Sequence, residues 1–135
     1  MDFPLDMHKN AFKASLAGLC AMDQGKFWEM NEKLFNNPTN SPTWLEQENL
    51  LKLAEGLGLD MTTFKSCFDS GKHDVEIKQR IAEGQGKAGI TGTPAFLLGY
   101  MMSDGKVKAV KKLVGAAPYA NFKAAIDKVL STKNR

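Results

Sequence analysis

The hydrophobic period of this 135-residue chain changes once, close to Gly92. Before that point apolar residues recur every three or four positions, which is the spacing of amphipathic helices. After it, two apolar segments flank Ser103-Asp104-Gly105-Lys106, and an Asp-Gly pair in that position is the strongest short signal for a β-hairpin. The sequence therefore predicts a mostly helical α+β fold, in which a helical bundle is followed by a hairpin and a last helix.

The expected elements can be placed by residue range. Helices are predicted at 8–22, 27–35, 42–57, 60–70, 74–87 and 119–130, and strands at 94–102 and 107–114. The strand alternation slips near Val110–Lys111, which indicates a bulge. The last helix is expected to turn Phe122, Ile126, Val129 and Leu130 inward. Because two strands make a poor sheet alone, helices or further strands must pack against them.

Composition and charge exclude several classes of function. The net charge of +3 is too small to indicate nucleic-acid binding, and the cluster Lys106, Lys108, Lys111 and Lys112 is interpreted as a solvated strand face. No apolar run approaches the ~20 residues that span a bilayer, so no membrane partner is expected. The start, Met1-Asp2-Phe3-Pro4, is unlike a signal peptide. We therefore expect a cytoplasmic protein, or a periplasmic or exported one if this chain is a piece of a longer precursor.

The cysteines and histidines do not form a recognisable site. Cys20 and Cys67 lie 47 positions apart on the apolar faces of predicted helices, where cysteine commonly acts as a small hydrophobe. No Cys-x-x-Cys occurs, and His8 and His73 stand far apart in polar surroundings. The zinc-ligand spacings are absent, so no metal and no cofactor are expected, and each histidine is interpreted as a surface residue.

A rigid kink precedes the first strand. Thr93-Pro94 stands directly before the apolar run 95–98, and Gly89 and Gly92 lie just upstream. Proline donates no hydrogen bond to a sheet, so it belongs at the first residue of a strand, at an edge or in a bulge. Taken alone, this pattern is typical of a tight turn.

Four stretches together resemble the DsbA-like branch of the thioredoxin superfamily. They are "DFPLDMHKNAF" (2–12), "CAMDQGKFWEMNEKLF" (20–35), "LGLDMTTFKSCFDSGK" (57–72), and "GITGTPAFLLG" (89–99) with "GAAPYANFKAAIDKVL" (115–130). The resemblance implies a helical insertion domain over 1–90 and the C-terminal β-β-α half of a thioredoxin fold over 91–135. The chain would then be a partial fold of that family.

The resemblance also implies a site. Family members oppose a Cys-x-x-Cys, whose first cysteine is a low-pKa thiolate, to a cis-proline loop that binds extended substrate peptides. Here that loop would be Gly92, Thr93 and Pro94, with a cis Thr93–Pro94 bond and with Thr93 offering its backbone to the peptide. The Cys-x-x-Cys half would precede Met1 and is absent from this sequence.

Three functions are therefore weighed. The first is a fragment of a thiol-disulfide oxidoreductase that is inactive in this form, so whether the chain is an enzyme stays open. The second is a non-catalytic module for peptide binding or assembly. The third is a glutathione-using relative, such as a kappa-class transferase or an isomerase.

Two structural expectations complete the analysis. The resemblance leaves open whether Cys20 and Cys67 form a structural disulfide. It also places strand 94–102 beside a first strand that this chain lacks. Its apolar residues Phe96, Leu97, Leu98 and Tyr100 would then lie on a free edge, which favours a homodimer. The rival is a helix of the same chain folded over that edge.

Overall fold

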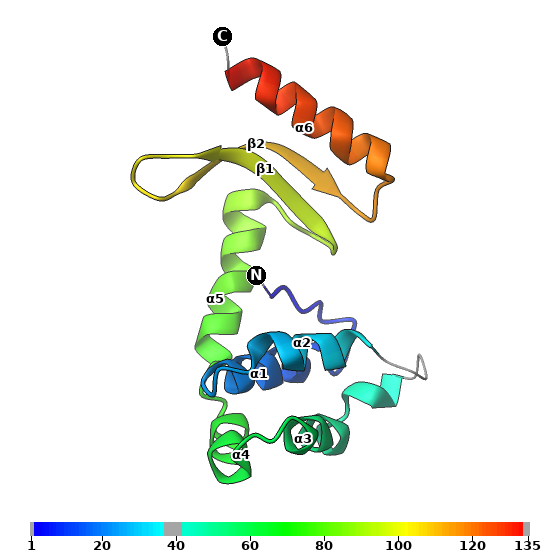
Figure 1. The fold of residues 1–135 in the computed structure, drawn as a ribbon, viewed down its shortest axis with the longest axis vertical. Helices are drawn as coiled ribbons and strands as arrows, with labels where there is room; N and C mark the ends of the chain where they lie inside the picture. The colour runs from blue at the N-terminus through cyan, green and yellow to red at the C-terminus, as the bar shows by residue number, and fades with distance from the viewer. Residues whose placement is uncertain (1, 37–41, 134–135) are drawn as a thin grey trace. The chain divides into compact units, whose positions relative to one another are not determined.

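The computed structural model describes residues 2–36 and 42–133. The chain divides into two compact units, Met1–Gly89, here called the helical unit, and Ile90–Arg135, here called the hairpin unit (Figure 1). Helices and one two-stranded antiparallel sheet make up the described elements, so the predicted α+β class is confirmed.

The helical unit contains the five predicted helical segments, with one of them divided. Its elements are α1 (Ala11–Met22), α2 (Phe27–Phe35), the 3-10 helix η1 (Pro42–Leu45), α3 (Gln47–Gly56), α4 (Met61–Ser70) and α5 (Asp74–Ala88). The single helix expected over 42–57 is wrong, because Glu46 adopts an extended backbone (φ −69°, ψ 152°) and separates η1 from α3. The amide of Asn49 donates to the Thr43 carbonyl and holds this break closed.

Helix α1 forms the centre of the helical unit. Six consecutive residues, 16–21, are buried, and α2, α3, α4 and α5 all contact this helix. Small side chains at Ala17, Gly18 and Ala21 allow such close approach, and a Cβ on Gly18 would already lie 3.7 Å from the Phe27 ring. The core consists of Leu16, Ala17, Leu19, Cys20, Ala21, Met30, Leu50, Ala54, Leu59, Phe64, Cys67, Phe68 and Ile77.

A disulfide joins α1 to α4 inside this core. Cys20 and Cys67, whose pairing the sequence left open, are bonded, with their Cα atoms 5.9 Å apart. The two residues are 1% and 7% exposed. Gln24 adds a second link between the same helices, because its side chain accepts from the Asp60 amide (2.9 Å) and donates to the Asp60 carbonyl (3.2 Å).

The hairpin unit consists of β1 (Ala95–Met101), β2 (Val107–Val114) and α6 (Tyr119–Lys133). The strands pair antiparallel, and Leu98 faces Lys111 while Gly99 faces Ala109, so Val110 is the extra residue. The predicted bulge is therefore confirmed. At the bulge the two backbones lie so close that only glycine fits at position 99. A Cβ built on Gly99 would lie 2.2 Å from the Lys108 carbonyl oxygen.

Helix α6 packs on one face of the hairpin (Figure 1). The rings of Phe96 and Phe122 meet edge to face at 4.8 Å, and the Tyr100 hydroxyl donates to the Val129 carbonyl. The inward positions predicted for Ile126 and Leu130 are wrong, because both are exposed. Two strands are too narrow to cover the whole apolar stripe of α6.

We predict that the disulfide contributes most of its stability by restricting the unfolded chain. Crosslinking residues 47 positions apart should stabilise the folded helical unit by about 4 kcal/mol on the loop-entropy account. Urea unfolding with and without a dithiol reductant measures the difference. Unfolded, unreduced protein should show no titratable thiol, and two reactive thiols would contradict the bond.

Candidate functional site

The loop Gly92-Thr93-Pro94 leads directly into β1. Its Thr93–Pro94 peptide bond is cis, and the Pro94 carbonyl accepts a hydrogen bond from the Gly115 amide at 2.8 Å. That bond ties the start of β1 to the end of β2. The side chains of Thr93 and Pro94 are exposed, and nothing lies within 4 Å of a Cβ built on Gly92. The loop is therefore held at its base and open to solvent at its tip.

Strand β1 continues the loop with one unpaired edge. Within residues 90–133 its backbone pairs with β2 alone. An open strand edge presents alternating amide donors and carbonyl acceptors, which is the surface that an added strand recognises. The loop and the edge together therefore offer the hydrogen-bonding groups that an extended peptide backbone can bind.

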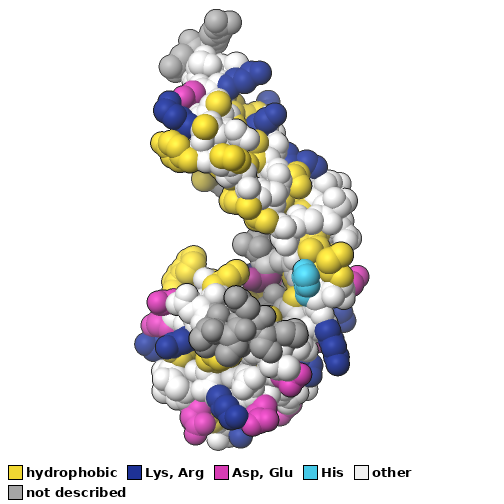
Figure 2. All heavy atoms as spheres, turned by 90° about the vertical axis from the view of Figure 1, so that its right-hand side faces the viewer, with side chains coloured by type: hydrophobic (Ala, Val, Ile, Leu, Met, Phe, Trp, Pro, Cys, Tyr) yellow, Lys and Arg dark blue, Asp and Glu magenta, His cyan; other side chains and the backbone are white. Residues whose placement is uncertain are grey.

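The four apolar residues that the sequence placed on the edge of β1 differ in how exposed they are. Phe96 and Leu97 are exposed, whereas Leu98 and Tyr100 are half-buried. Phe96 and Tyr100 already contact α6, so they are shared between that helix and any partner. Figure 2 shows further hydrophobic side chains on the surface of the hairpin unit, interspersed with lysines.

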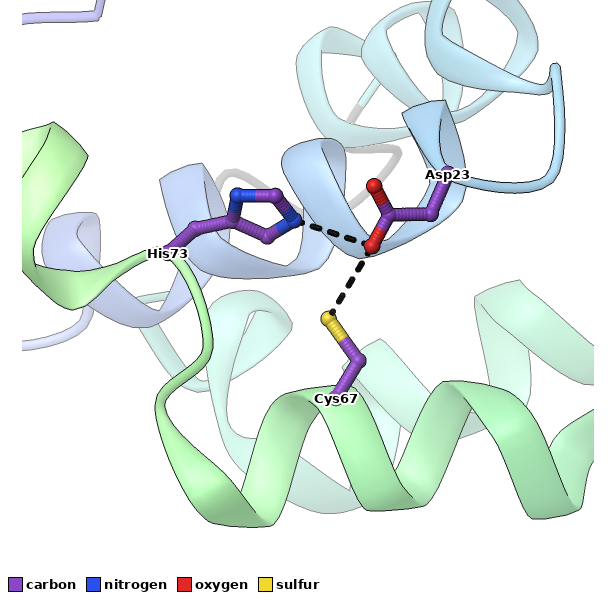
Figure 3. A group of neighbouring side chains, drawn as sticks. All are labelled: Asp23, Cys67 and His73. Carbon is purple, nitrogen blue, oxygen red and sulfur yellow. Dashed lines mark hydrogen bonds and ion pairs between the residues drawn. The ribbon is translucent and has the colours of Figure 1, made fainter.

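A second cluster lies beside the disulfide in the helical unit (Figure 3). Oδ2 of Asp23 is 2.9 Å from Nε2 of His73, 2.8 Å from Nζ of Lys72 and 3.7 Å from Sγ of Cys67. A disulfide sulfur carries no proton, so the contact with Cys67 is not a hydrogen bond while the bond to Cys20 exists. The one carboxylate oxygen thus faces two nitrogen groups and a sulfur.

The neighbouring charged groups lower the pKa of Asp23. The hydrogen bond from the Lys72 ammonium group is the main cause that lowers the pKa of the Asp23 carboxyl, and His73 acts in the same direction. Partial removal from water opposes both effects. Asp23 is consequently an anion at neutral pH.

His73 is not the surface residue that the sequence indicated. Its side chain is only 11% exposed, with Nε2 against Asp23 and Nδ1 3.1 Å from Oε2 of Glu76. Glu76 in turn pairs with Arg80, which also binds Asp2. The ring is thus fixed between two carboxylates, whereas His8 is exposed.

Local structure explains how these residues come together. Asp23 follows α1 one turn after Cys20. Gly71 ends α4 in the left-handed conformation (φ 62°, ψ 36°), and the Lys72 amide donates back to the Cys67 carbonyl. This turn reverses the chain and brings Lys72 and His73 beside Cys67.

Sequence reasoning missed this cluster because its members lie on separate elements. Asp23 and His73 are 50 positions apart, and no short motif contains both. One signal existed: Cys20 and Cys67 each lie within one turn of the end of a predicted helix, so pairing them would bring Asp23 and His73, which follow those two ends, near each other. Because the sequence leaves the pairing of the two cysteines open, it does not predict that these residues are neighbours.

Both sulfur-bearing residues are buried, but a depression of the surface lies over the disulfide on the same side. This depression is lined by Cys20, Asp23, Thr62, Thr63, Ser66, Cys67, Ser70 and Lys72. A thiolate could approach Cys67 through this opening, since exchange requires access to one sulfur of the bond. Asp23, Cys67 and His73 are also the group of described residues whose ligand atoms are close enough to hold a metal ion.

Among residues 2–36 and 42–133, no helix is long and apolar enough to cross a bilayer. The chain nevertheless matches part of some proteins named for transport. It is 32% identical over 93 residues to the Na⁺/H⁺ antiporter NhaA 1 of Salinispora arenicola, which covers 69% of this chain and 14% of that protein. It is 30% identical over 93 residues to the Na⁺/H⁺ antiporter NhaA 3 of Salinispora tropica, which again covers 69% of this chain and 14% of that protein.

The chain thus spans a small fraction of the length of these relatives. No solved structure matches it. The model of the DSBA-like thioredoxin domain, a family of thiol-disulfide oxidoreductase type, matches residues 1–127, which is nearly the whole chain. With its helical bundle, hairpin and closing helix, this chain belongs to the DSBA-like thioredoxin domain family.

Proposed function

We propose that this chain is the peptide-binding portion of a thiol-disulfide oxidoreductase domain. The observation that carries the proposal is the loop Gly92-Thr93-Pro94, which is open to solvent and runs into a strand with one unpaired edge. A loop and edge of this kind recognise backbone rather than side chains, so the partner is an extended or unfolded polypeptide. We do not propose ion exchange for this chain, because its match to the antiporters covers only 14% of their length.

We further propose that the chain alone does not catalyse disulfide exchange. Catalysis requires an exposed low-pKa thiolate with a resolving cysteine nearby. The two cysteines are instead bonded to each other, and Cys20 is 1% exposed within the core. A disulfide of this kind serves structure, and it fits an oxidising compartment such as the periplasm better than the cytosol.

The peptide site can be tested at Thr93. Changing Thr93→Pro removes the backbone amide, whereas Thr93→Ala keeps the backbone and removes only the side chain. We expect the proline variant to weaken binding of a labelled, carboxymethylated unfolded polypeptide at least about tenfold, the loss of a hydrogen bond worth about 1.5 kcal/mol. Fluorescence anisotropy measures the affinity.

The alanine variant is the matched control and should bind like the parent. Equal weakening in both variants would show that recognition uses the threonine side chain, and unchanged binding in both would reject the loop as the site. NMR signals assigned to Tyr100 and Phe96, which pack on α6, check that the proline variant retains the hairpin unit.

Absence of turnover is tested with the insulin reduction assay. The chain should not exceed the rate of dithiothreitol alone, because its buried cysteine pair offers no exposed attacking thiolate. A rate above this background that disappears in a Cys67→Ser variant would prove the proposal wrong.

We also propose that the open edge of β1 supports self-association. In residues 90–133 no residue is buried, and large apolar side chains including Leu97, Met101 and Val114 are exposed. Two copies that pair β1 antiparallel about a two-fold axis would form a four-stranded sheet and cover part of this surface. Self-association would then compete with peptide for the same edge.

Leu97→Lys tests the dimer by placing a charge on the exposed side of β1. We expect sedimentation of the parent at tens of micromolar to show a dimer and the variant to weaken association at least about tenfold, since burying an unpaired lysine is costly. Val75→Lys adds the same charge to an exposed valine of the helical unit and should leave association unchanged. A monomeric parent, or equal loss in both variants, would reject the interface.

A further inference from the structure

We propose that Asp23, Cys67 and His73 bind Zn²⁺ when the Cys20–Cys67 disulfide is reduced. Oxidation then blocks the site, because a sulfur bonded to Cys20 is no longer a thiolate ligand. This zinc site is separate from the peptide-binding function proposed for the hairpin unit.

The spacing of the three ligand atoms matches a tetrahedral ion. Zinc bonds of about 2.0 Å to nitrogen or oxygen and about 2.3 Å to sulfur imply ligand separations of about 3.3 Å for N···O and 3.5 Å for S···O. The observed separations are 2.9 Å between His73 Nε2 and Asp23 Oδ2 and 3.7 Å between Cys67 Sγ and the same oxygen. All three ligand atoms lie within 4.8 Å of one another. The two separations that involve Asp23 therefore each differ from the tetrahedral value by a few tenths of an ångström (Figure 3).

The surroundings of His73 are those of a metal ligand. Its Nδ1 lies 3.1 Å from the Glu76 carboxylate, while Nε2 lies 2.9 Å from Oδ2 of Asp23. A carboxylate that accepts from one ring nitrogen fixes the ring and directs the other nitrogen at a metal, as outer-shell partners of zinc histidines do. Glu76 is itself held by Arg80, so this support is rigid.

A cation already pairs with Asp23, one of the three proposed ligands. The Lys72 ammonium group lies 2.8 Å from Asp23 Oδ2, and its side chain is 57% exposed. A long exposed lysine can turn into solvent at little cost, because a surface ion pair is worth about 1 kcal/mol or less. The Asp23 carboxylate is then free to exchange one cation for another. Because Asp23 and Cys67 both line the depression over the disulfide, a water from it would supply the fourth ligand.

The redox step is a thiol-disulfide exchange with a dithiol reductant. A reductant thiolate attacks Sγ of Cys67, the bond to Cys20 breaks, and Cys67 forms a mixed disulfide with the reductant. The second reductant thiolate then attacks the reductant sulfur of this mixed disulfide, which releases the Cys67 thiolate and forms a cyclic disulfide. The products are the Cys20 and Cys67 thiols and one oxidised dithiol. Zinc then replaces the proton of the Cys67 thiol, which passes to solvent.

Two variants lack the disulfide but differ in which cysteine they keep, so together they distinguish the role of Cys67 from that of Cys20. Cys20→Ala leaves Cys67 as a permanent thiol, so it should bind one Zn²⁺ per chain without any reductant. Cys67→Ala removes the ligand itself and should bind at least about 100-fold more weakly, beyond the 10- to 100-fold loss that an outer-shell change causes. Calorimetric titration with Zn²⁺ alone measures affinity, and Co²⁺ substitution reports thiolate coordination by its charge-transfer absorption.

The histidines give a second matched pair on the reduced parent chain. His73→Ala should weaken binding at least about 100-fold, whereas His8→Ala, which changes the exposed histidine, should leave it unchanged. The oxidised parent should bind as weakly as Cys67→Ala. Equal binding by the two cysteine variants, or by oxidised and reduced parent, would overturn the proposal.

Loss of the disulfide could also unfold the helical unit. In that case Zn²⁺ should restore the helical circular dichroism of Cys20→Ala but not of Cys67→Ala, because only the first retains all three ligands. Failure of zinc to restore Cys20→Ala would count against the site.

Discussion

The packing of α1 against its neighbours is the interaction on which the helical unit depends. A helix of a small protein normally buries one stripe, yet residues 16–21 of α1 are buried without interruption. Alanine and glycine in this stretch let α2, α3, α4 and α5 approach its backbone closely. The end of α1 is consequently fixed, and with it Cys20 and Asp23. The disulfide and the polar cluster are both consequences of where this helix ends.

The hairpin unit differs from the helical unit because it has no buried core in its described residues. None of its residues in 90–133 is buried, since a two-stranded sheet with one helix cannot enclose a side chain. What it does have is a well-defined backbone: the bulge at Val110, the hydrogen bond from Gly115 to Pro94 and the anchor of Tyr100 on α6. A unit with fixed backbone and uncovered apolar surface is suited to recognition by strand pairing, which uses both features.

Sequence patterns predicted those features that are set locally or by a single apolar face. The helical period located α1, α2, α4 and α5, and the slip in alternation located the bulge at Val110. Predictions failed where a contact that the hydrophobic period does not register decides the outcome. The break at Glu46 depends on side-chain hydrogen bonding across a turn, and the exposure of Ile126 depends on the width of the sheet beneath it. The burial of His73 depends on Asp23, 50 positions away, which periodicity does not register.

The disulfide and the proposed zinc site are alternative crosslinks of nearly the same loop. The bond from Cys20 to Cys67 closes a separation of 47 residues, while coordination would join Asp23 to Cys67 and to His73 across separations of 44 and 50. Loop-closure entropy varies only with the logarithm of length, so each crosslink restricts the unfolded chain by about 4 kcal/mol. Exchange of one for the other would therefore leave the constraint between α1 and α4 almost unchanged. The chemistry at Cys67 would change with redox conditions while the fold around it is retained.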